Sequence, residues 1–142
     1  ATMVIADTGV KGATKEAIMA VQELLKTDHE HAQTHIEHLG QLVDNSRQFL
    51  AKGEVFKLGT TLNAAQQDLQ ALQVSDDQLD HLIDVAIHHG ALGAKLTGGG
   101  RGGCMFAITR TALGARKLAA ILKDNGARQT WIQPLDTTRG EN

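Results

Sequence analysis

Apolar residues recur along much of the chain with the period of an α-helix. Within residues 14–26, 27–52, 55–72 and 75–89 they fall three or four positions apart, which places them on one face of each predicted helix. Thr14 is expected to cap the first helix, and the segments TDHE and SDDQ have the capping-box pattern before the second and the fourth. Gly53 and Gly90 are expected to end two of them. The pattern therefore predicts four consecutive helices.

Short apolar segments lie on either side of this helical region. TMVIAD, ALGAKLT, CMFAI and RQTWIQPL, at residues 2–7, 91–97, 104–108 and 128–135, are predicted as strands, with the middle two joined as a hairpin. Thr111 opens a last predicted helix that ends at Asn125-Gly126, and the tail 136–142 is expected to fray. We expect the apolar faces of the first and last helices to be buried, at Ile18, Val21, Leu24, Leu25, Leu113, Leu118, Ile121 and Leu122.

The order strand, helices, hairpin, helix, strand predicts the fold class. Right-handed crossovers close such a chain as an α+β domain, a ferredoxin-like split βαβ sandwich with additional helices. We expect residues 1–142 to form one domain, because no repeat or Pro-rich linker divides them. The chain enters its first strand almost at once, and we therefore expect it to be a fragment.

Composition narrows the class of partner. The chain has 142 residues, 42% hydrophobic and 21% charged, which is typical of a folded domain. A formal net charge of −2, with three Phe and one Trp, argues against nucleic-acid binding, and no apolar run reaches the length of a membrane span. The single Cys104 fits a reducing cytoplasm, and we expect it to be a small buried residue rather than a nucleophile.

Five glycines occupy six positions at residues 98–103, interrupted only by Arg101. A glycine in ordered structure costs about 0.5 to 1 kcal/mol relative to alanine, so five cost about 2.5 to 5 kcal/mol. That cost favours a loop whose backbone must approach another group closely, and the alternative is a flexible hairpin tip. Gly98, Gly100 and Gly103 satisfy G-x-G-x-x-G, but an apolar strand follows instead of a helix, and no Lys-Ser or Lys-Thr completes a Walker A loop. We therefore expect a phosphate cradle of another type, built from backbone N–H groups.

Two other polar clusters have simpler explanations. His31, His35 and His38 share one flank of a predicted helix, where a solvated face is expected rather than a metal site. His88 and His89 suit the C-terminus of their helix without any ligand. Asp7-Thr8-Gly9 ends the first strand, and its residues alone predict an Asx or ST turn.

One segment resembles a known family. GALGAKLTGGGRGGCMFAI, residues 90–108, is similar to the third signature of the superfamily of galactokinase, homoserine kinase, mevalonate kinase and phosphomevalonate kinase, abbreviated GHMP. ADTGVKGATKEAI, residues 6–18, is similar to the strand and loop that open the C-terminal domain of the mevalonate kinases. The resemblance covers essentially the whole chain but only the second half of the family's proteins.

The resemblance implies a cleft between this domain and an N-terminal domain, where ATP, Mg²⁺ and mevalonate bind. The serine-rich ATP loop and the catalytic Asp and Lys of the family belong to that missing domain, so we expect no catalytic residue, no metal ligand and no tightly bound cofactor in this chain. The expected cleft loop comprises Thr97, Gly98, Gly99, Gly100, Arg101, Gly102 and Gly103. Arg101 departs from the family's usual glycine or alanine, and solvent is slightly favoured over phosphate for its side chain. By position Thr8, with Asp7, would lie near the substrate.

The function expected from this resemblance is ATP-dependent phosphorylation of mevalonate to 5-phosphomevalonate in isoprenoid biosynthesis, by the whole enzyme and not by this chain alone. The partners implied are mevalonate, the N-terminal domain and a second copy in a homo-oligomer. Two alternatives stay open: another GHMP kinase, acting on phosphomevalonate or homoserine, and a stand-alone ferredoxin-like module that binds a small ligand.

Overall fold

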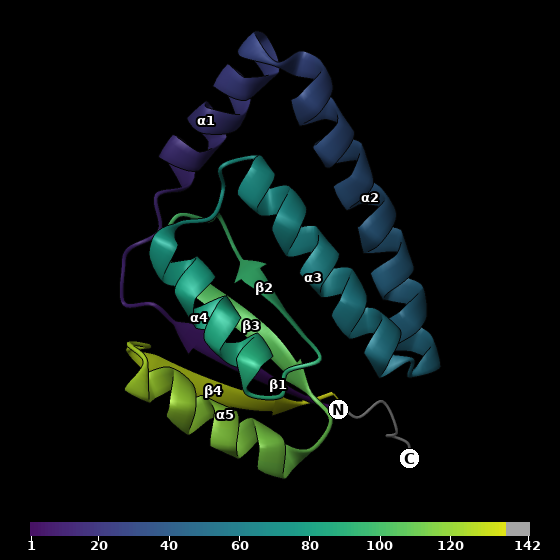
Figure 1. The fold of residues 1–142 in the computed structure, drawn as a ribbon, viewed down its shortest axis with the longest axis vertical. Coiled ribbons are helices and arrows are strands. Elements are labelled where there is room, and N and C mark those ends of the chain that lie inside the picture. Colours follow the sequence, from purple (N-terminus) through teal and green to yellow (C-terminus); the bar gives the residue numbers. More distant parts are fainter. Residues whose placement is uncertain (136–142) are drawn as a thin grey trace.

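Four strands form one antiparallel sheet in the computed structural model, which describes residues 1–135 (Figure 1). They are β1 (Thr2–Asp7), β2 (Gly93–Thr97), β3 (Cys104–Thr109) and β4 (Gln129–Pro134), in the order β2-β3-β1-β4. The first strand is therefore central, and β3 separates it from β2. This is the split βαβ topology, so the predicted ferredoxin-like α+β fold is confirmed.

The five helices lie close to their predicted positions. They are α1 (Thr14–Thr27), α2 (His29–Lys52), α3 (Val55–Ala71), α4 (Asp77–His88) and α5 (Ala112–Asp124). Thr111 caps α5 as predicted, since its hydroxyl accepts the N–H of Gly114 at 3.0 Å. Gly53 ends α2 in the left-handed conformation, also as predicted.

Three of the predicted caps are wrong. Thr14 is the first residue of α1, because Ala13 takes the cap position with its N–H bonded to the carbonyl of Arg101. The hydroxyl of Thr27 bonds to the carbonyl of Glu23 inside α1, so the TDHE segment supplies no side-chain cap to α2. Asp76, rather than the serine before it, caps α4.

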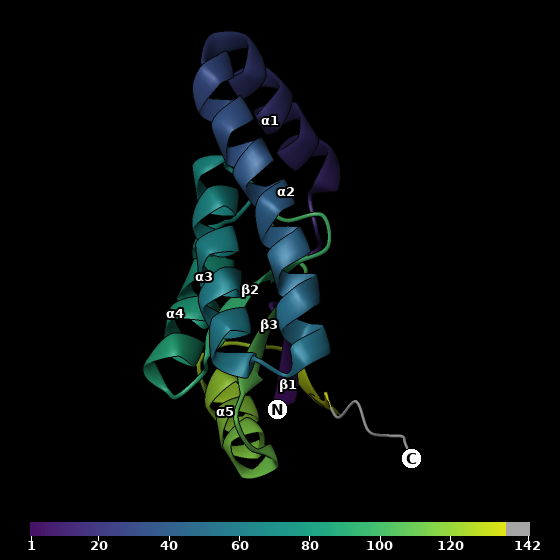
Figure 2. The ribbon, with the colours of Figure 1, turned by 90° about the vertical axis from the view of Figure 1, so that its right-hand side faces the viewer.

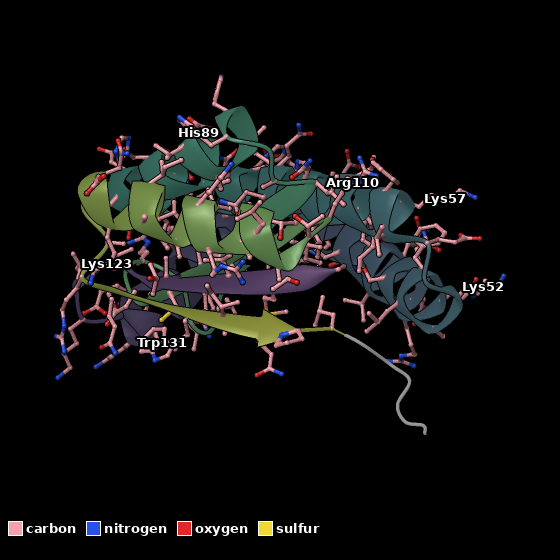
Figure 3. All side chains as sticks on the ribbon, turned by 90° about the horizontal axis from the view of Figure 1, so that it is seen from below. Lys52, Lys57, His89, Arg110, Lys123 and Trp131 are labelled. Carbon is pink, nitrogen blue, oxygen red and sulfur yellow. The ribbon has the colours of Figure 1, made fainter. Side chains whose placement is uncertain are left out.

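The main core lies between one face of the sheet and the helices α4 and α5. Val4, Met105, Leu82, Leu118 and their neighbours are almost completely excluded from solvent there. Seen from below, α5 lies above the sheet, while Trp131 of β4 points to the opposite side (Figure 3). We call that opposite side the open face, because no helix of the described part of the chain covers it near β4, where Trp131 is 43% exposed.

Helix α3 closes the edge of the sheet at β2. Gly59 and Gly93 bring the two backbones so close that a Cβ on either residue would overlap the other segment. The outward N–H groups of Ala94 and Leu96 are then accepted by side chains of α3, Asn63 at 3.0 Å and Gln66 at 2.9 Å. The otherwise unpaired edge of β2 is satisfied in this way.

Helix α1 and the first half of α2 project away from the sandwich (Figure 2). Of the side chains that we expected to be buried in the first and last helices, Leu118 and Leu122 are buried, two are exposed, and the others, Val21, Leu24, Leu25 and Ile121, are half-buried. Ile18 is 52% exposed, because α1 has α2 as its main neighbour. Leu113 is 53% exposed, because it lies about 200° around α5 from the buried Ala115. No helix within residues 1–135 has the length and hydropathy needed to cross a bilayer. The fraying expected of 136–142 lies outside the described residues.

Candidate functional site

The glycine loop, residues 98–103, joins β2 to β3 and is held in place by two other segments. The N–H of Arg101 donates to the carbonyl of Val74 in the α3–α4 turn, at 2.9 Å. On the other side, the loop between β1 and α1 is bonded twice, by Ala13 N–H to the Arg101 carbonyl at 2.9 Å and by Gly103 N–H to the Val10 carbonyl at 2.8 Å. Bonds on both sides disfavour a flexible hairpin tip.

Two different constraints, positive φ and close packing, account for the glycines of this loop. Gly98, Gly100, Gly102 and Gly103 have φ values between +80° and +99°, a region that side chains strongly disfavour. A Cβ on Gly100 would overlap Val74, and one on Gly102 would lie 2.7 Å from the Lys11 carbonyl oxygen. By contrast, the space beside Gly98 and Gly103 is open. Close packing within the chain therefore requires part of the glycine pattern, and ligand approach need explain only the remainder.

Backbone donors remain free in this loop. Among residues 1–135, no acceptor pairs with the N–H groups of Gly98, Gly99, Gly100 or Gly102. The first two of these residues are exposed to solvent, and the other two are buried. Free N–H groups on successive residues of a turn are the elements of an anion-binding nest. The arrangement suits the oxygens of a phosphate group.

Asp7 and Thr8 lie beside the glycine loop. The Asp7 carboxylate accepts the N–H of Gly9 at 2.9 Å, and the buried Thr8 hydroxyl donates to the Gly103 carbonyl at 2.8 Å while accepting Val10 N–H at 3.2 Å. Both side chains thus form the predicted turns and also position the loop. Their bonds give each a structural role before any ligand is considered.

Cys104 follows the loop and faces Asp7 across the β1–β3 pair. Burial and, after it, the negative charge of Asp7 raise the pKa of the Cys104 thiol. A thiol that stays protonated is a poor nucleophile, but Cys104 is half-buried and not buried as predicted.

The Arg101 side chain is half-buried and bonds to the protein, whereas the sequence analysis slightly favoured solvent. Its Nε donates to the Gln73 carbonyl at 2.9 Å. Gln73 and Arg101 are also the two non-glycine residues with positive φ within residues 1–135. The side chain therefore fastens the glycine loop to the α3–α4 turn. Sequence reasoning missed this contact, because the two residues are far apart in the chain.

Two of the three aligned histidines do not lie on a purely solvated face. His35 and His38 of α2 each place Nδ1 2.6 Å from one carboxylate oxygen of Asp68, whose side chain is 5% exposed. Through these contacts the two histidines join α2 to α3, whereas the sequence predicted a solvated face. The described residues bring no group of three or more His, Cys, Asp or Glu side chains together in a metal-binding arrangement. His88 and His89 bond carbonyls of their own helix, as the end of a helix favours.

Comparison with known proteins identifies the family. Residues 20–128 match the family described as GHMP kinases C terminal. The chain is 36% identical over 111 residues to a mevalonate kinase of Pyrococcus horikoshii and 32% identical over 125 residues to that of Aeropyrum pernix. These alignments cover 75% and 87% of this chain.

The fold comparison agrees. A crystal structure of L. major mevalonate kinase in complex with R-mevalonate superposes on 93% of this chain with a TM-score of 0.86 and 25% identity. In each case the chain spans only part of the relative: 33% and 38% of the two archaeal enzymes and 42% of the L. major chain. The family match, the sheet order and the glycine hairpin together show that this chain belongs to the GHMP kinases and carries the family's C-terminal domain.

Proposed function

We propose that this chain is the C-terminal part of a mevalonate kinase, an enzyme that transfers the γ-phosphate of ATP to mevalonate, as a step in isoprenoid biosynthesis. The similarity to several mevalonate kinases supports this choice of substrate over the other GHMP kinases. The observation that carries the proposal is the glycine loop, with free N–H groups beside Asp7 and Thr8.

In this proposal the glycine loop forms one wall of the phosphate-transfer cleft. Phosphoryl transfer depends on positioning and on donors preorganised toward the negative charge of the phosphate oxygens. The free N–H groups of Gly98 and Gly99 are exposed and fixed by the bonds of Arg101 and Gly103, so they can donate without rearranging. Thr8, whose hydroxyl bonds to the Gly103 carbonyl, would form the part of this wall nearest the substrate.

ATP and Mg²⁺ fit this chain only in part. The glycine loop offers donors for phosphate oxygens, whereas residues 1–135 offer no grouped carboxylates for a divalent cation. Mg²⁺, when bound, would neutralise charge on the transferring phosphate. We assign its ligands and the catalytic acid–base groups to the N-terminal domain, which agrees with the family resemblance.

An apolar surface next to the glycine loop supports docking of that N-terminal domain. Val10 precedes α1, and Ile18 and Met19 lie on it; all three are more than half exposed. Several exposed large apolar side chains on and before one helix are typical of an interaction site. In the isolated chain the same surface would favour a homo-oligomer.

A phosphorylation assay on the isolated chain tests the assignment of roles. With ATP, Mg²⁺ and mevalonate, we expect no turnover above buffer, because one wall of a cleft cannot position both substrates. Turnover by residues 1–142 alone would place the catalytic groups in this chain and contradict the proposal. Tight binding of a small effector by calorimetry, without any activity after an N-terminal domain is supplied, would favour a stand-alone binding module.

A further inference from the structure

A continuous apolar groove runs between α2 and the open face of the sheet. Two adjoining cavities of about 370 and 400 Å³ share Val43, Ser46, Leu62 and Phe106 as walls. The first extends to Met3 and Leu135 near the ends of β1 and β4, and the second extends along α2 to Leu39. The size is that of a small-molecule pocket, and the walls are almost entirely hydrocarbon. This groove lies apart from the glycine loop and has no role in the function proposed above.

Two cations line this groove, Lys95 in the second cavity and the exposed Arg47 in the first, and neither has an ion pair within residues 1–135. Lys95 of β2 lines the second cavity, with Nζ 5.5 Å from the centre of the Phe106 ring. Its ammonium donates one hydrogen bond, to the Leu96 carbonyl at 2.7 Å. The three ion pairs found within residues 1–135 all involve other side chains. Burial lowers the pKa of Lys95, which shows that this environment disfavours its charge.

A buried charge is costly unless it is paired, and an ammonium can make three hydrogen bonds. A ligand that supplied an anion to Nζ would therefore gain a charge-assisted bond at a half-buried position with largely hydrocarbon surroundings. The same ligand would have to be apolar elsewhere, because all the other lining residues of the second cavity except Ser46 are apolar, among them Leu62, Phe106 and Val43. The ligand that fits this groove therefore has an anionic head and an apolar tail.

We propose that this groove binds an amphiphilic anion, with a carboxylate or phosphate head at Lys95 and an aliphatic chain extending between α2 and the open face toward Met3. The contact at Phe106 orients the ammonium, and the exposed Val43 lies at the mouth. The seven residues after Leu135 do not suit this role themselves, because their sequence DTTRGEN contains no aliphatic side chain longer than that of threonine.

The test uses the 142-residue chain and calorimetric titration with decanoate and decyl phosphate, both below their micelle concentrations. Decanol tests the tail alone, and decyltrimethylammonium tests the sign of the head. We expect both anions to bind at least tenfold more tightly than decanol, and the cation to bind no better than decanol. The ratio of decanoate to decyl phosphate affinity then distinguishes a carboxylate from a phosphate ligand.

Titration of substituted chains tests which residues form the binding site. Lys95→Met should remove the tenfold preference for decanoate over decanol, and Lys95→Arg should keep it. Lys57→Met is the matched control, because Lys57 also lies over an aromatic ring, that of Phe49, but outside the groove. Val43→Asp, at an exposed position, should weaken alcohol binding through the lost apolar contact, and anion binding further through charge repulsion, without disturbing the fold.

Three results would overturn the proposal: no decanoate binding, equal anion preference in Lys95→Met and the unaltered chain, or equal binding of the cationic amphiphile. Sedimentation of the same samples tests whether a second copy of the chain occupies the groove instead. A dimer that Val43→Asp dissociates and decanoate does not would assign the groove to a second copy of the chain, and would likewise contradict the proposal.

Discussion

Gly98 and Gly102 differ only in their surroundings. Both have left-handed backbone, with φ of 87° and 99°. A Cβ at Gly98 meets nothing within 4 Å, whereas at Gly102 it would be squeezed by the carbonyls of Val10 and Lys11. The pair separates the cost of backbone conformation from the cost of close packing.

Gly98→Ala should lower the free energy of unfolding by about 1 to 2 kcal/mol, the cost of a left-handed alanine. Gly102→Ala should lower the free energy of unfolding by the same amount and by about 1 to 3 kcal/mol more, because its Cβ would overlap the β1–α1 loop. Urea unfolding followed by circular dichroism measures both. Equal losses at the two positions would show that the loop does not pack against that segment.

Arg101 tests whether its side chain holds the loop. Arg101→Ala removes the bond to the Gln73 carbonyl but keeps the left-handed backbone, and should cost about 1 kcal/mol. Arg101→Gly loses the same bond but relieves the backbone, so it should be more stable than Arg101→Ala by about 1 kcal/mol. If urea unfolding gave Arg101→Ala the stability of the unaltered chain, the bond would have no energetic role.

Among the elements, α3 does more than its sequence pattern indicates. Its apolar positions predicted a buried stripe, and Leu58, Leu62, Ala65 and Leu72 are indeed buried. The periodicity gave no sign that Gln66, a polar residue, would be 4% exposed and bonded to the edge of β2. Hydrophobic pattern predicts which face is apolar; it does not show which polar groups meet across the chain.

Gln66→Leu should destabilise the chain by about 1 to 3 kcal/mol, because it leaves the N–H of Leu96 buried without an acceptor. Gln67→Leu, the same change one residue later at an exposed position, is the control and should change the stability by less than about 0.5 kcal/mol. Hydrogen exchange at Leu96 should be faster in Gln66→Leu alone. Equal exchange in the two variants would exclude a role in sealing the edge.

The contact between α2 and α3 depends on Asp68 with His35 and His38. Spacing along α2 showed that the histidines share a flank, but only the tertiary structure supplies their acceptor. A double-mutant cycle with His35→Ala and Asp68→Ala should give a coupling free energy of about 0.5 to 3 kcal/mol. Replacing the exposed His31 by Ala in the same cycle should give a smaller coupling, since no hydrogen bond joins it to Asp68 within the described residues. Additive losses for His35 and Asp68 would contradict the contact.

In the molecule as a whole, the hairpin and the order of elements along the chain followed from patterning and turn residues, because each rests on local chemistry. The fold class needed in addition the rule that crossovers are right-handed. The placement of α1 could not be predicted in this way. Its amphipathic sequence requires a partner surface but does not identify it, and the chain leaves Ile18 and Met19 exposed. The same limit applies to the glycine loop, whose packing role became clear only from the neighbouring β1–α1 loop.

Exposure of that α1 surface predicts self-association of the isolated chain. Sedimentation velocity at rising concentration should show a species larger than a monomer, and a double substitution, Ile18→Asp with Met19→Asp, should weaken it. The matched control, Glu16→Gln with Lys15→Gln, changes exposed polar residues of the same helix and should not. A monomer at every concentration would argue that the surface does not need a partner.

The most direct test joins this chain to the N-terminal region of the Pyrococcus horikoshii mevalonate kinase, the part that its alignment here does not cover, and measures mevalonate-dependent ATP turnover. We predict turnover by the chimera and none by either part alone. Gly98→Val in the chimera should reduce kcat by more than its loss of folding stability explains, because its side chain would enter the open space over the free N–H groups. A folded chimera without turnover, or one that Gly98→Val leaves fully active, would contradict the account of the glycine loop as a wall of the phosphate-transfer cleft.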